Sequence, residues 1–351
     1  MAMGHRQPDR LPKGFFGTAD SMAMLRRGLG FDGDDQVLNQ LGVDVRHIEP
    51  TFVGPSERSG GLQCLDNANS DFWGVPRRLV ATEFGTYSEI SDSPLAKAVS
   101  VAEIEEYQWP SQKWFDTSSI AGQISAANTK EPRWINYHRA GKLFEICWAL
   151  RGMENLMIDM IERPEMVHAM LRNVLSFYIE LGQRVIKVAG GGIDMVTIGD
   201  DVGTQRGMMI SPGLWREIIK PYLKEMVKAF HDLNVKVMYH SCGSILAIIP
   251  ELIDIGVDVL EPIQTSAQGM DPSALKDAYG DRLCFHGGVD EQRLLPFGSP
   301  DQIREEVMHL ASTLGRGGGY ILMAAHAFQP DIPVENVLAM YEAADHCYTS
   351  E

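Results

Sequence analysis

The chain has 351 residues, of which 44% are hydrophobic and 22% are charged, and it contains no low-complexity tract. These values exclude a disordered protein and describe one large globular domain or two small ones. A total of 31 Lys and Arg against 47 Asp and Glu gives a net charge of −16, which disfavours nucleic acid and anionic membranes as partners. Apolar stretches such as 245–249 are too short to span a membrane, and no apolar leader opens the chain, so we expect a cytoplasmic protein.

The first 131 residues carry weak structural signals. Short strands are expected at 14–17 and 43–48. Residues 51–131 are rich in turns and in short polar-apolar alternations, such as 78–89. We interpret this segment as an insertion made of turns and short strands.

Strands and helices alternate regularly after residue 131. The expected strands are 133–138, 193–198, 235–239, 257–260, 283–286 and 320–323. Helices are expected up to 151 and 161, at 164–188, from Ser211-Pro212 onward, and at 244–255, 272–278, 300–314 and 333–348. Most of these strands are apolar throughout, as strands buried on both faces of a parallel sheet are.

Eight expected strands with helices between them predict an α/β protein with a (β/α)8 TIM-type barrel. Such a barrel usually needs about 250 residues, so the chain leaves room for the insertion at 51–131 within a single domain of residues 1–351. An open, doubly wound sheet is the alternative. In a barrel, the active site lies at the carboxyl ends of the strands, which directs attention to the polar residues there.

Polar residues with ligand chemistry stand at these strand ends. They are Tyr137, His138, Asp200, Asp201, His240, Cys242, Glu261, Gln264, His286, Asp290, His326 and Gln329. Nitrogen, sulfur and carboxylate groups gathered at one barrel mouth would suit Zn²⁺. His240 and Cys242 are the strongest pair, because residues two apart at a strand end point to the same side. A hydrogen-bonded His beside a buried Cys is the structural alternative.

The remaining cysteines give no sign of a disulfide framework. Five cysteines are an odd number, which favours reduced thiols. We interpret four of them as structural: Cys64, Cys147, Cys284 and Cys347.

Several segments together resemble a known superfamily. They are His5-Arg-Gln-Pro-Asp-Arg-Leu-Pro12, Gly199-Asp-Asp-Val-Gly-Thr-Gln205, Ile210-Ser-Pro212, Tyr239-His-Ser-Cys-Gly243, Gly287-Gly-Val-Asp290, and His326 with Pro333-Val-Glu-Asn336. The chain resembles the uroporphyrinogen decarboxylase superfamily, which includes the decarboxylase and zinc-dependent, corrinoid-linked methyltransferases. The resemblance implies a (β/α)8 barrel.

The resemblance also separates the two branches. The decarboxylase branch opens its barrel with two arginines that bind tetrapyrrole carboxylates, whereas residues 14–20 of this chain contain no arginine. The methyltransferase branch carries His-x-Cys at the fifth strand and a third ligand, usually Cys, after the last strand. The resemblance therefore implies that His240, Cys242 and His326 bind Zn²⁺, with histidine in place of the usual third cysteine. The decarboxylase branch also carries a histidine at that position.

These observations lead to a functional hypothesis. We expect a zinc-dependent methyltransferase that moves a methyl group between a small methylated donor, such as a methoxy compound, or a thiol acceptor and a corrinoid protein. Asp201 and Glu261 are the expected catalytic residues. As structural alternatives, Asp200 and Asp201 could cap a helix before Thr204 or Ser211, and Glu261 could cap a helix or be solvated. The expected substrate-binding residues are Tyr137, Asp200, Gln205 and His286.

Two alternatives stay open. A metal-free decarboxylase or lyase would use Asp201 and His326 for proton transfer. A barrel that only binds a small molecule is the third possibility. The segment 136–141 nearly matches the Asp-x-His-x-x-Gly signature of corrinoid-binding domains, but it lacks the Asp. We therefore expect the corrinoid on a separate protein.

Overall fold

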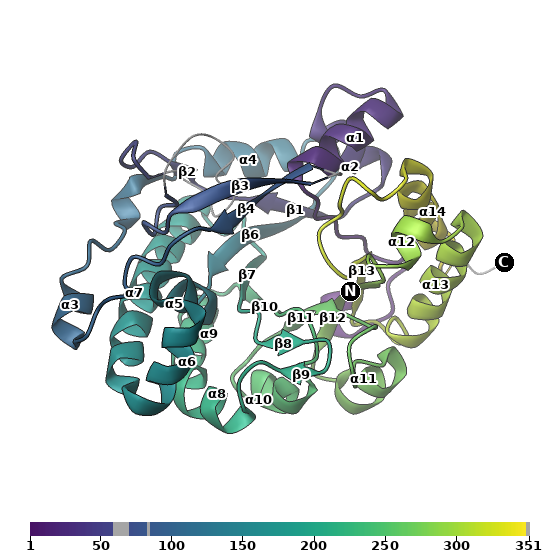
Figure 1. Ribbon diagram of the computed structural model, residues 1–351. Helices are drawn as coiled ribbons and strands as arrows, with labels where there is room; N and C mark the ends of the chain where they lie inside the picture. The colour runs from purple at the N-terminus through teal and green to yellow at the C-terminus, as the bar shows by residue number, and fades with distance from the viewer. Residues whose placement is uncertain (59–69, 83–84, 349–351) are drawn as a thin grey trace. The chain divides into compact units, whose positions relative to one another are not determined.

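The computed structural model describes residues 1–58, 70–82 and 85–348 (Figure 1). The chain divides into two compact units. Unit 1 comprises Met1–Arg46, Val202–Met209 and Met238–Glu351, and unit 2 comprises His47–Asp201 and Ile210–Val237. The single domain with an insertion at 51–131 stays a prediction.

Seven strands form the main sheet. Their order is β1 (Val45–Ile48), β6 (Trp134–Gly141), β7 (Met195–Gly199), β10 (Lys236–His240), β11 (Val259–Ile263), β12 (Cys284–Val289) and β13 (Tyr320–Ala324). The pairs β6–β7, β10–β11, β11–β12 and β12–β13 are parallel. The strand order follows the chain order without reversal, whereas a doubly wound sheet reverses at a switch point. The sheet is therefore wound as in a barrel.

The expected strand at 14–17 is present only as two isolated β-bridges. Lys13 and Gly17 make isolated parallel bridges to Leu322 and Phe328. On its other side, the Lys13 carbonyl accepts hydrogen bonds from the backbone N–H groups of Asp44 and Val45, at 2.8 and 3.3 Å. The segment thus pairs with β13 and with the start of β1 but is too short to count as a strand. Gly14 and Gly17 explain this, because glycine weakens a strand interior.

Three strands, β6, β11 and β12, end three residues beyond their predicted bounds. β11 is displaced from the expected 257–260, and β12 extends three residues past 286. Pro262 and the pair Gly287-Gly288 hid these extensions, since both residue types usually interrupt strands. The ladder to β13 nevertheless continues through Gly288 opposite Met323. As a result, Glu261 and His286 lie inside buried strands rather than in loops.

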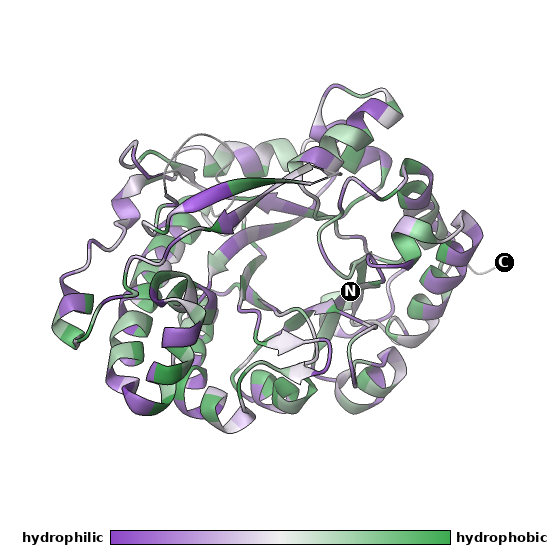
Figure 2. Ribbon diagram, viewed as in Figure 1, coloured by the Kyte–Doolittle hydropathy of each residue, from purple (hydrophilic) through white to green (hydrophobic). Residues whose placement is uncertain are grey.

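Unit 1 contains the first two α-helices and the helices from α10 onward. They are α1 (Ala19–Leu29), α2 (Asp34–Gln40), α10 (Ile249–Asp254), α11 (Pro272–Tyr279), α12 (Leu294–Phe297), α13 (Pro300–Thr313) and α14 (Val334–Asp345), with the 3-10 turns η1 (Ala2–Gly4) and η3 (Leu246–Ile248). The expected helix at 244–255 therefore begins with a 3-10 turn and is α-helical only from Ile249. α13 starts at a capping box of Ser299 and Gln302 and packs against α14. Figure 2 shows the alternating hydrophilic and hydrophobic residues along α13.

Unit 2 contains the long helix α7 (Pro164–Ala189), which has Pro164 in its first turn and a left-handed Gly190 at its end. The other helical segments are α3 (Val101–Glu105), η2 (Gln112–Trp114), α4 (Ile120–Ala127), α5 (Phe144–Arg151), α6 (Met153–Glu162), α8 (Pro212–Ile218) and α9 (Lys220–His231). The helix expected from Ser211-Pro212 is thus two helices, with Pro221 near the start of the second. Among the described residues, no helix is long and apolar enough to cross a membrane.

Residues 51–131 belong to unit 2. The alternation at 78–89 forms the antiparallel pair β3 (Arg77–Thr82) and β4 (Gly85–Ile90), as expected. A second short pair joins β2 (Thr51–Phe52) and β5 (Phe115–Asp116). The helices α3 and α4 were not expected, because each is at most eight residues long and shows little periodicity.

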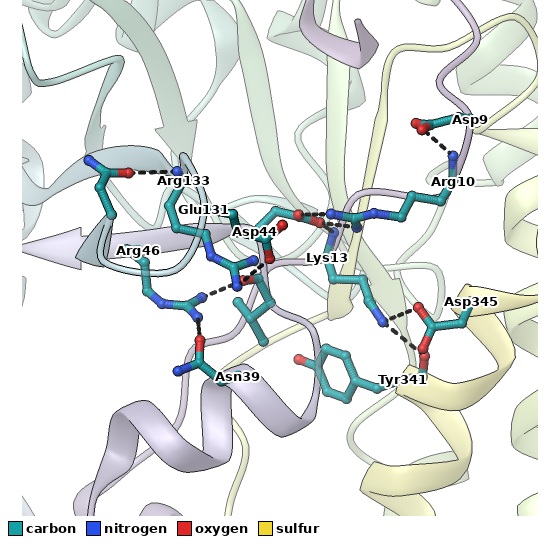
Figure 3. Close-up of polar contacts among 12 residues, drawn as sticks. Asp9, Arg10, Lys13, Asn39, Asp44, Arg46, Glu131, Arg133, Tyr341 and Asp345 are labelled. Carbon is teal, nitrogen blue, oxygen red and sulfur yellow. Dashed lines mark hydrogen bonds and ion pairs between the residues drawn. The ribbon is translucent and has the colours of Figure 1, made fainter. Parts of the chain in front are cut away.

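The side chain of Lys13 is buried, and its backbone forms the bridge to Leu322 of β13. It is only 1% exposed, and its ammonium group contacts the Asp345 carboxylate and the Tyr341 carbonyl (Figure 3). In the same region, Arg10 pairs with Asp44, and Arg46 donates to Asn39. A buried ammonium needs such partners, because it has left water.

We predict that Asp345→Asn lowers the free energy of unfolding by about 1–3 kcal/mol, because the buried Lys13 ammonium loses its counter-charge. The control Asp301→Asn removes an exposed pair with Arg304 and should cost less than about 0.5 kcal/mol. Urea denaturation of both variants measures the difference. Equal stabilities for the two variants would contradict this role of Asp345.

Candidate functional site

His240 and Cys242 lie together in unit 1. His240 is the last residue of β10, and Cys242 follows two residues later. The distance from Cys242 Sγ to His240 Nε2 is 3.7 Å. The His240 side chain is 23% exposed and Cys242 is partly exposed, so neither residue is fully buried.

Glu261 holds the opposite side of the His240 ring. Its backbone is paired with His240 in the β10–β11 ladder, and its Oε2 lies 2.6 Å from His240 Nδ1. Burial alone would raise the pKa of Glu261, but the charge and hydrogen bond of His240, with the charges of His286 and His326, lower this pKa overall. An ionised Glu261 can only accept hydrogen bonds. His240 therefore donates its Nδ1 proton and keeps the Nε2 lone pair toward Cys242.

Glu261 is neither solvated nor a helix cap, the two structural alternatives considered for it. The residue is only 6% exposed and lies inside β11. Its carboxylate is bonded to an imidazole rather than to a helix N-terminus. Sequence reasoning expected Glu261 at the end of its strand, whereas the residue lies in the middle of β11, and the sequence could not show its partner.

The backbone after Cys242 is held by close packing. Gly243 has φ +81°, and a Cβ at this position would lie 2.7 Å from backbone atoms of Thr204. The Gly243 N–H donates to Gln264 Oε1 at 2.7 Å, and the Ser244 N–H donates to the Thr204 carbonyl at 2.8 Å. Only glycine fits this left-handed, crowded position. These contacts fix the chain that carries the Cys242 thiol.

The Thr204 contact comes from a small hairpin, β8 (Gly203–Thr204) and β9 (Gly207–Met208). Gln205 lies at its tip and is exposed, and its carbonyl accepts a hydrogen bond from the Gln268 N–H at 2.9 Å. The side chain of Gln205 is therefore available on the surface, while its backbone is anchored.

His286 and His326 occupy different environments. His286 is 2% exposed within β12, and a Cβ on Gly14 would lie 2.3 Å from its Nε2, so the glycine lets the backbone lie directly on the ring. His326 is exposed in the loop after β13. Among the described residues, His326 belongs to no set of three candidate ligand atoms within 4.8 Å of one another.

Asp200 and Asp201 follow β7 in unit 2. Asp200 is 1% exposed, and its carboxylate accepts hydrogen bonds from the backbone N–H groups of Leu143 and Glu145 at 2.9 Å. It therefore caps the start of α5, not a helix near Ser211. Asp201 is partly exposed, and its N–H donates to Glu145 Oε2 at 3.4 Å. Burial, followed by the charge of Glu145, raises the pKa of Asp200 to about 7.

Tyr137 lies in β6 and lines a cavity of unit 2 with a volume of about 480 Å³. Its other wall residues come from several segments, among them β2, β5 and α7. Sequence reasoning missed them, because aromatic residues scattered over distant segments form no local motif. The near-match at 136–141 is also part of β6: Asn136 Nδ2 lies 3.0 Å from His47 Nδ1 and donates to Thr197 Oγ1 at 2.7 Å.

Three of the four cysteines interpreted as structural are buried and free, and Cys64 lies outside the described residues. Burial raises the pKa of the Cys147 thiol and raises that of Cys284 to about 12. Protonated thiols in apolar surroundings are poor nucleophiles and poor metal ligands. Cys242 is thus the candidate thiolate among the described cysteines.

The donor atoms of His240 and Cys242 fit zinc. Zn–S bonds of about 2.3 Å and Zn–N bonds of about 2.0–2.1 Å at a tetrahedral angle separate sulfur and nitrogen by about 3.6 Å. The observed separation is 3.7 Å. A carboxylate on the far nitrogen of the histidine is also typical of zinc sites.

Comparisons with known proteins place the chain in a family. The uroporphyrinogen decarboxylase (URO-D) family model matches residues 144–347, which is more than half of the chain. The chain therefore belongs to the URO-D family, and the resemblance inferred from its motifs is confirmed.

Individual relatives are distant. The chain is 25% identical over 196 residues to a uroporphyrinogen decarboxylase of Coxiella burnetii (strain Dugway 5J108-111), covering 53% of this chain and 48% of that protein. It is 28% identical over 193 residues to a uroporphyrinogen decarboxylase of Salinibacter ruber (strain DSM 13855 / M31), covering 53% and 50%. The chain spans about half the length of these curated relatives.

A solved structure extends the comparison over the whole chain. A methyltransferase from Methanosarcina mazei matches with a TM-score of 0.70 at 18% identity, covering 99% of this chain and 97% of that chain. At this identity the match shows the fold alone. Together with the order of the parallel strands, it confirms the predicted α/β, TIM-type class.

We predict a specific pH dependence of stability from Asp200. Its folded-state pKa is about 7, above its ordinary value of 3.8, so between these values the folded protein binds more protons than the unfolded chain. The contribution of Asp200 to the free energy of unfolding should fall as pH rises through this window, by at most about 1.4 kcal/mol per pH unit, and level off above it. Urea denaturation of wild type and Asp200→Asn at pH 5, 6, 7 and 8 measures this contribution as their difference. A difference that does not vary with pH would refute the prediction.

Proposed function

We propose that the protein is a zinc-dependent methyltransferase that moves a methyl group between a small methylated donor or thiol acceptor and a corrinoid protein. The observation that carries this proposal is the geometry of His240, with Glu261 on Nδ1 and the Cys242 thiol 3.7 Å from Nε2. Membership of the URO-D family and the fold shared with a methyltransferase from Methanosarcina mazei support it.

The proposed ligands are His240, Cys242 and His326. Bound Zn²⁺ would serve as a Lewis acid toward a donor oxygen or would hold a thiol as thiolate. Glu261 keeps the imidazole of His240 in the tautomer with a free Nε2 lone pair. Because Glu261 is buried and anionic, it also balances positive charge at the site. His326 would have to approach the other two ligands when the metal binds.

The remaining residues have proposed supporting roles. Asp201 follows β7 and is partly exposed, and it is proposed as a catalytic residue. Asp200 is proposed to act indirectly, by fixing the turn that starts α5. Gln205, on the hairpin that packs against Gly243, is proposed to contact the substrate, as is His286. The corrinoid is proposed to arrive on a separate protein.

A metal-free decarboxylase or lyase is the second candidate, because the curated relatives are uroporphyrinogen decarboxylases. In that case Asp201 and His326 would move protons. Residues 14–20 supply no arginine for tetrapyrrole carboxylates, and Gly14 instead brings bare backbone against His286. A binding protein without catalysis is the third candidate.

We predict about one zinc per chain in protein purified without added metal. Cys242→Ala and His240→Ala should each lose most of it, because two remaining ligands rarely retain zinc. Glu261→Gln should keep all three ligands but bind zinc about 10- to 100-fold more weakly, because the amide no longer fixes the imidazole. Metal analysis and competition with a chelator measure these effects.

The matched control is Cys347→Ala, which removes a buried thiol near the C-terminus and should keep its zinc. Stoichiometric zinc in both Cys242→Ala and His240→Ala would end the zinc assignment.

His326 allows a separate prediction. If it is the third ligand, His326→Ala should lose most of the zinc, whereas His326→Cys should keep it, because thiolate also binds zinc. Thiolate donates more charge, so His326→Cys should be slower with a methoxy donor at unchanged metal content. Zinc and turnover are measured on the same preparations. Full zinc in His326→Ala would remove His326 from the ligand set and indicate a role in proton transfer.

A further inference from the structure

The cavity in unit 2 has an unusually aromatic wall. Its volume is about 480 Å³, and six of its wall residues are Phe or Tyr: Phe52, Phe72, Phe115, Tyr137, Phe177 and Tyr178. A volume of this size is sufficient for a ligand with one or two rings. All of these residues belong to unit 2, whereas His240 and Cys242 belong to unit 1.

The rings of the wall already pack against one another in edge-to-face geometry. Phe115 lies 5.2 Å from Phe72 at 87° and 5.5 Å from Phe52 at 72°, measured between ring centroids. Phe177 lies 5.8 Å from Phe115 at 62°. Rings held by their neighbours are preorganised, and a flat ring inserted among them gains stacking beyond simple burial of area.

Tyr137 supplies a hydrogen-bond donor to this wall. Its side chain is 2% exposed, and within the described part of the chain its hydroxyl has no hydrogen-bond partner. Burial, together with the charge of Glu49, raises the pKa of Tyr137, so the group is a neutral phenol. A buried phenol without a partner is favourable only when a ligand or water accepts its proton.

The charged groups on the cavity favour an uncharged ligand. Glu49 and Arg139 both line it and carry opposite charges. The amide of Gln123 is satisfied by the Glu49 backbone, because Nε2 donates to the Glu49 carbonyl at 2.9 Å and Oε1 accepts from its N–H at 3.2 Å. The Gln123 amide is therefore engaged with the backbone, and the formal charges of Glu49 and Arg139 cancel.

We propose that this cavity binds a neutral aromatic compound with an oxygen on its ring, an aryl ether or phenol whose oxygen accepts the Tyr137 hydroxyl proton in a hydrogen bond. Binding itself needs only the residues of unit 2.

The test uses 4-methoxyphenol as the probe and trans-4-methoxycyclohexanol as its saturated analogue, with calorimetry on the full chain after treatment with a chelator. The aromatic probe should bind at least about tenfold more tightly, because the saturated ring cannot stack. Tyr137→Phe should weaken binding of the aromatic probe about fivefold through loss of one hydrogen bond. Phe52→Leu, at a half-buried position, should also weaken it.

Tyr87→Phe is the matched control, because it removes the hydroxyl of a half-exposed tyrosine on β4 that bonds Glu89. It should leave binding unchanged. Equal affinity for the two probes, no binding of either, or full affinity in Tyr137→Phe would overturn the proposal. Since the measurement is made without metal, these outcomes are independent of the zinc content: binding in a protein that never carries zinc would support the cavity and reject the methyltransferase.

Discussion

The hydrogen bond between Glu261 and His240 is the interaction on which the candidate site depends. It joins two neighbouring parallel strands at residues that are also paired in the ladder. A buried carboxylate is costly to desolvate, and the contact with His240, followed by His286 and His326, lowers the pKa of Glu261 overall. Removing the partner would leave an uncompensated charge in the sheet. The strand pairing and the imidazole tautomer are therefore linked.

The backbone around the site depends on a second constraint, the close packing that glycine allows because it has no side chain. Gly243 packs on the backbone of Thr204, and Gly14 packs on the ring of His286. In both contacts the glycine backbone lies so close to its neighbour that a Cβ atom would not fit between them. The segment from Lys13 to Gly17 likewise contains two glycines. It pairs with β13 and with the start of β1 although it is too short to be a strand. Around the site, backbone positions are set by glycine, and the polar side chains then project from fixed points.

The sequence predicted the elements whose signals are local. Apolar runs identified β6, β7, β10 and β13, and the Ser211-Pro212 pair identified the start of α8, where the Ser211 hydroxyl accepts from the Leu214 N–H. The spacing of His240 and Cys242 also places two donor atoms together, because it depends only on strand geometry. The bounds of β11 and β12 were wrong, because Pro262 and Gly287-Gly288 normally end strands and only the long-range ladder keeps them in place.

Other features could not be predicted because they depend on distant parts of the chain. The capping of α5 by Asp200 joins residues more than fifty positions apart. The aromatic cavity of unit 2 combines β2, β5, β6 and α7, and none of these segments has a distinctive pattern alone.

The central claim, that His240 and Cys242 together bind zinc, is tested most directly by X-ray absorption at the zinc edge of the purified protein. The account predicts a sulfur neighbour at about 2.3 Å and nitrogen or oxygen neighbours at about 2.0–2.1 Å, with the sulfur contribution absent from any zinc that Cys242→Ala retains. A zinc environment of oxygen and nitrogen alone in the wild-type protein, or an unchanged sulfur contribution in Cys242→Ala, would contradict it.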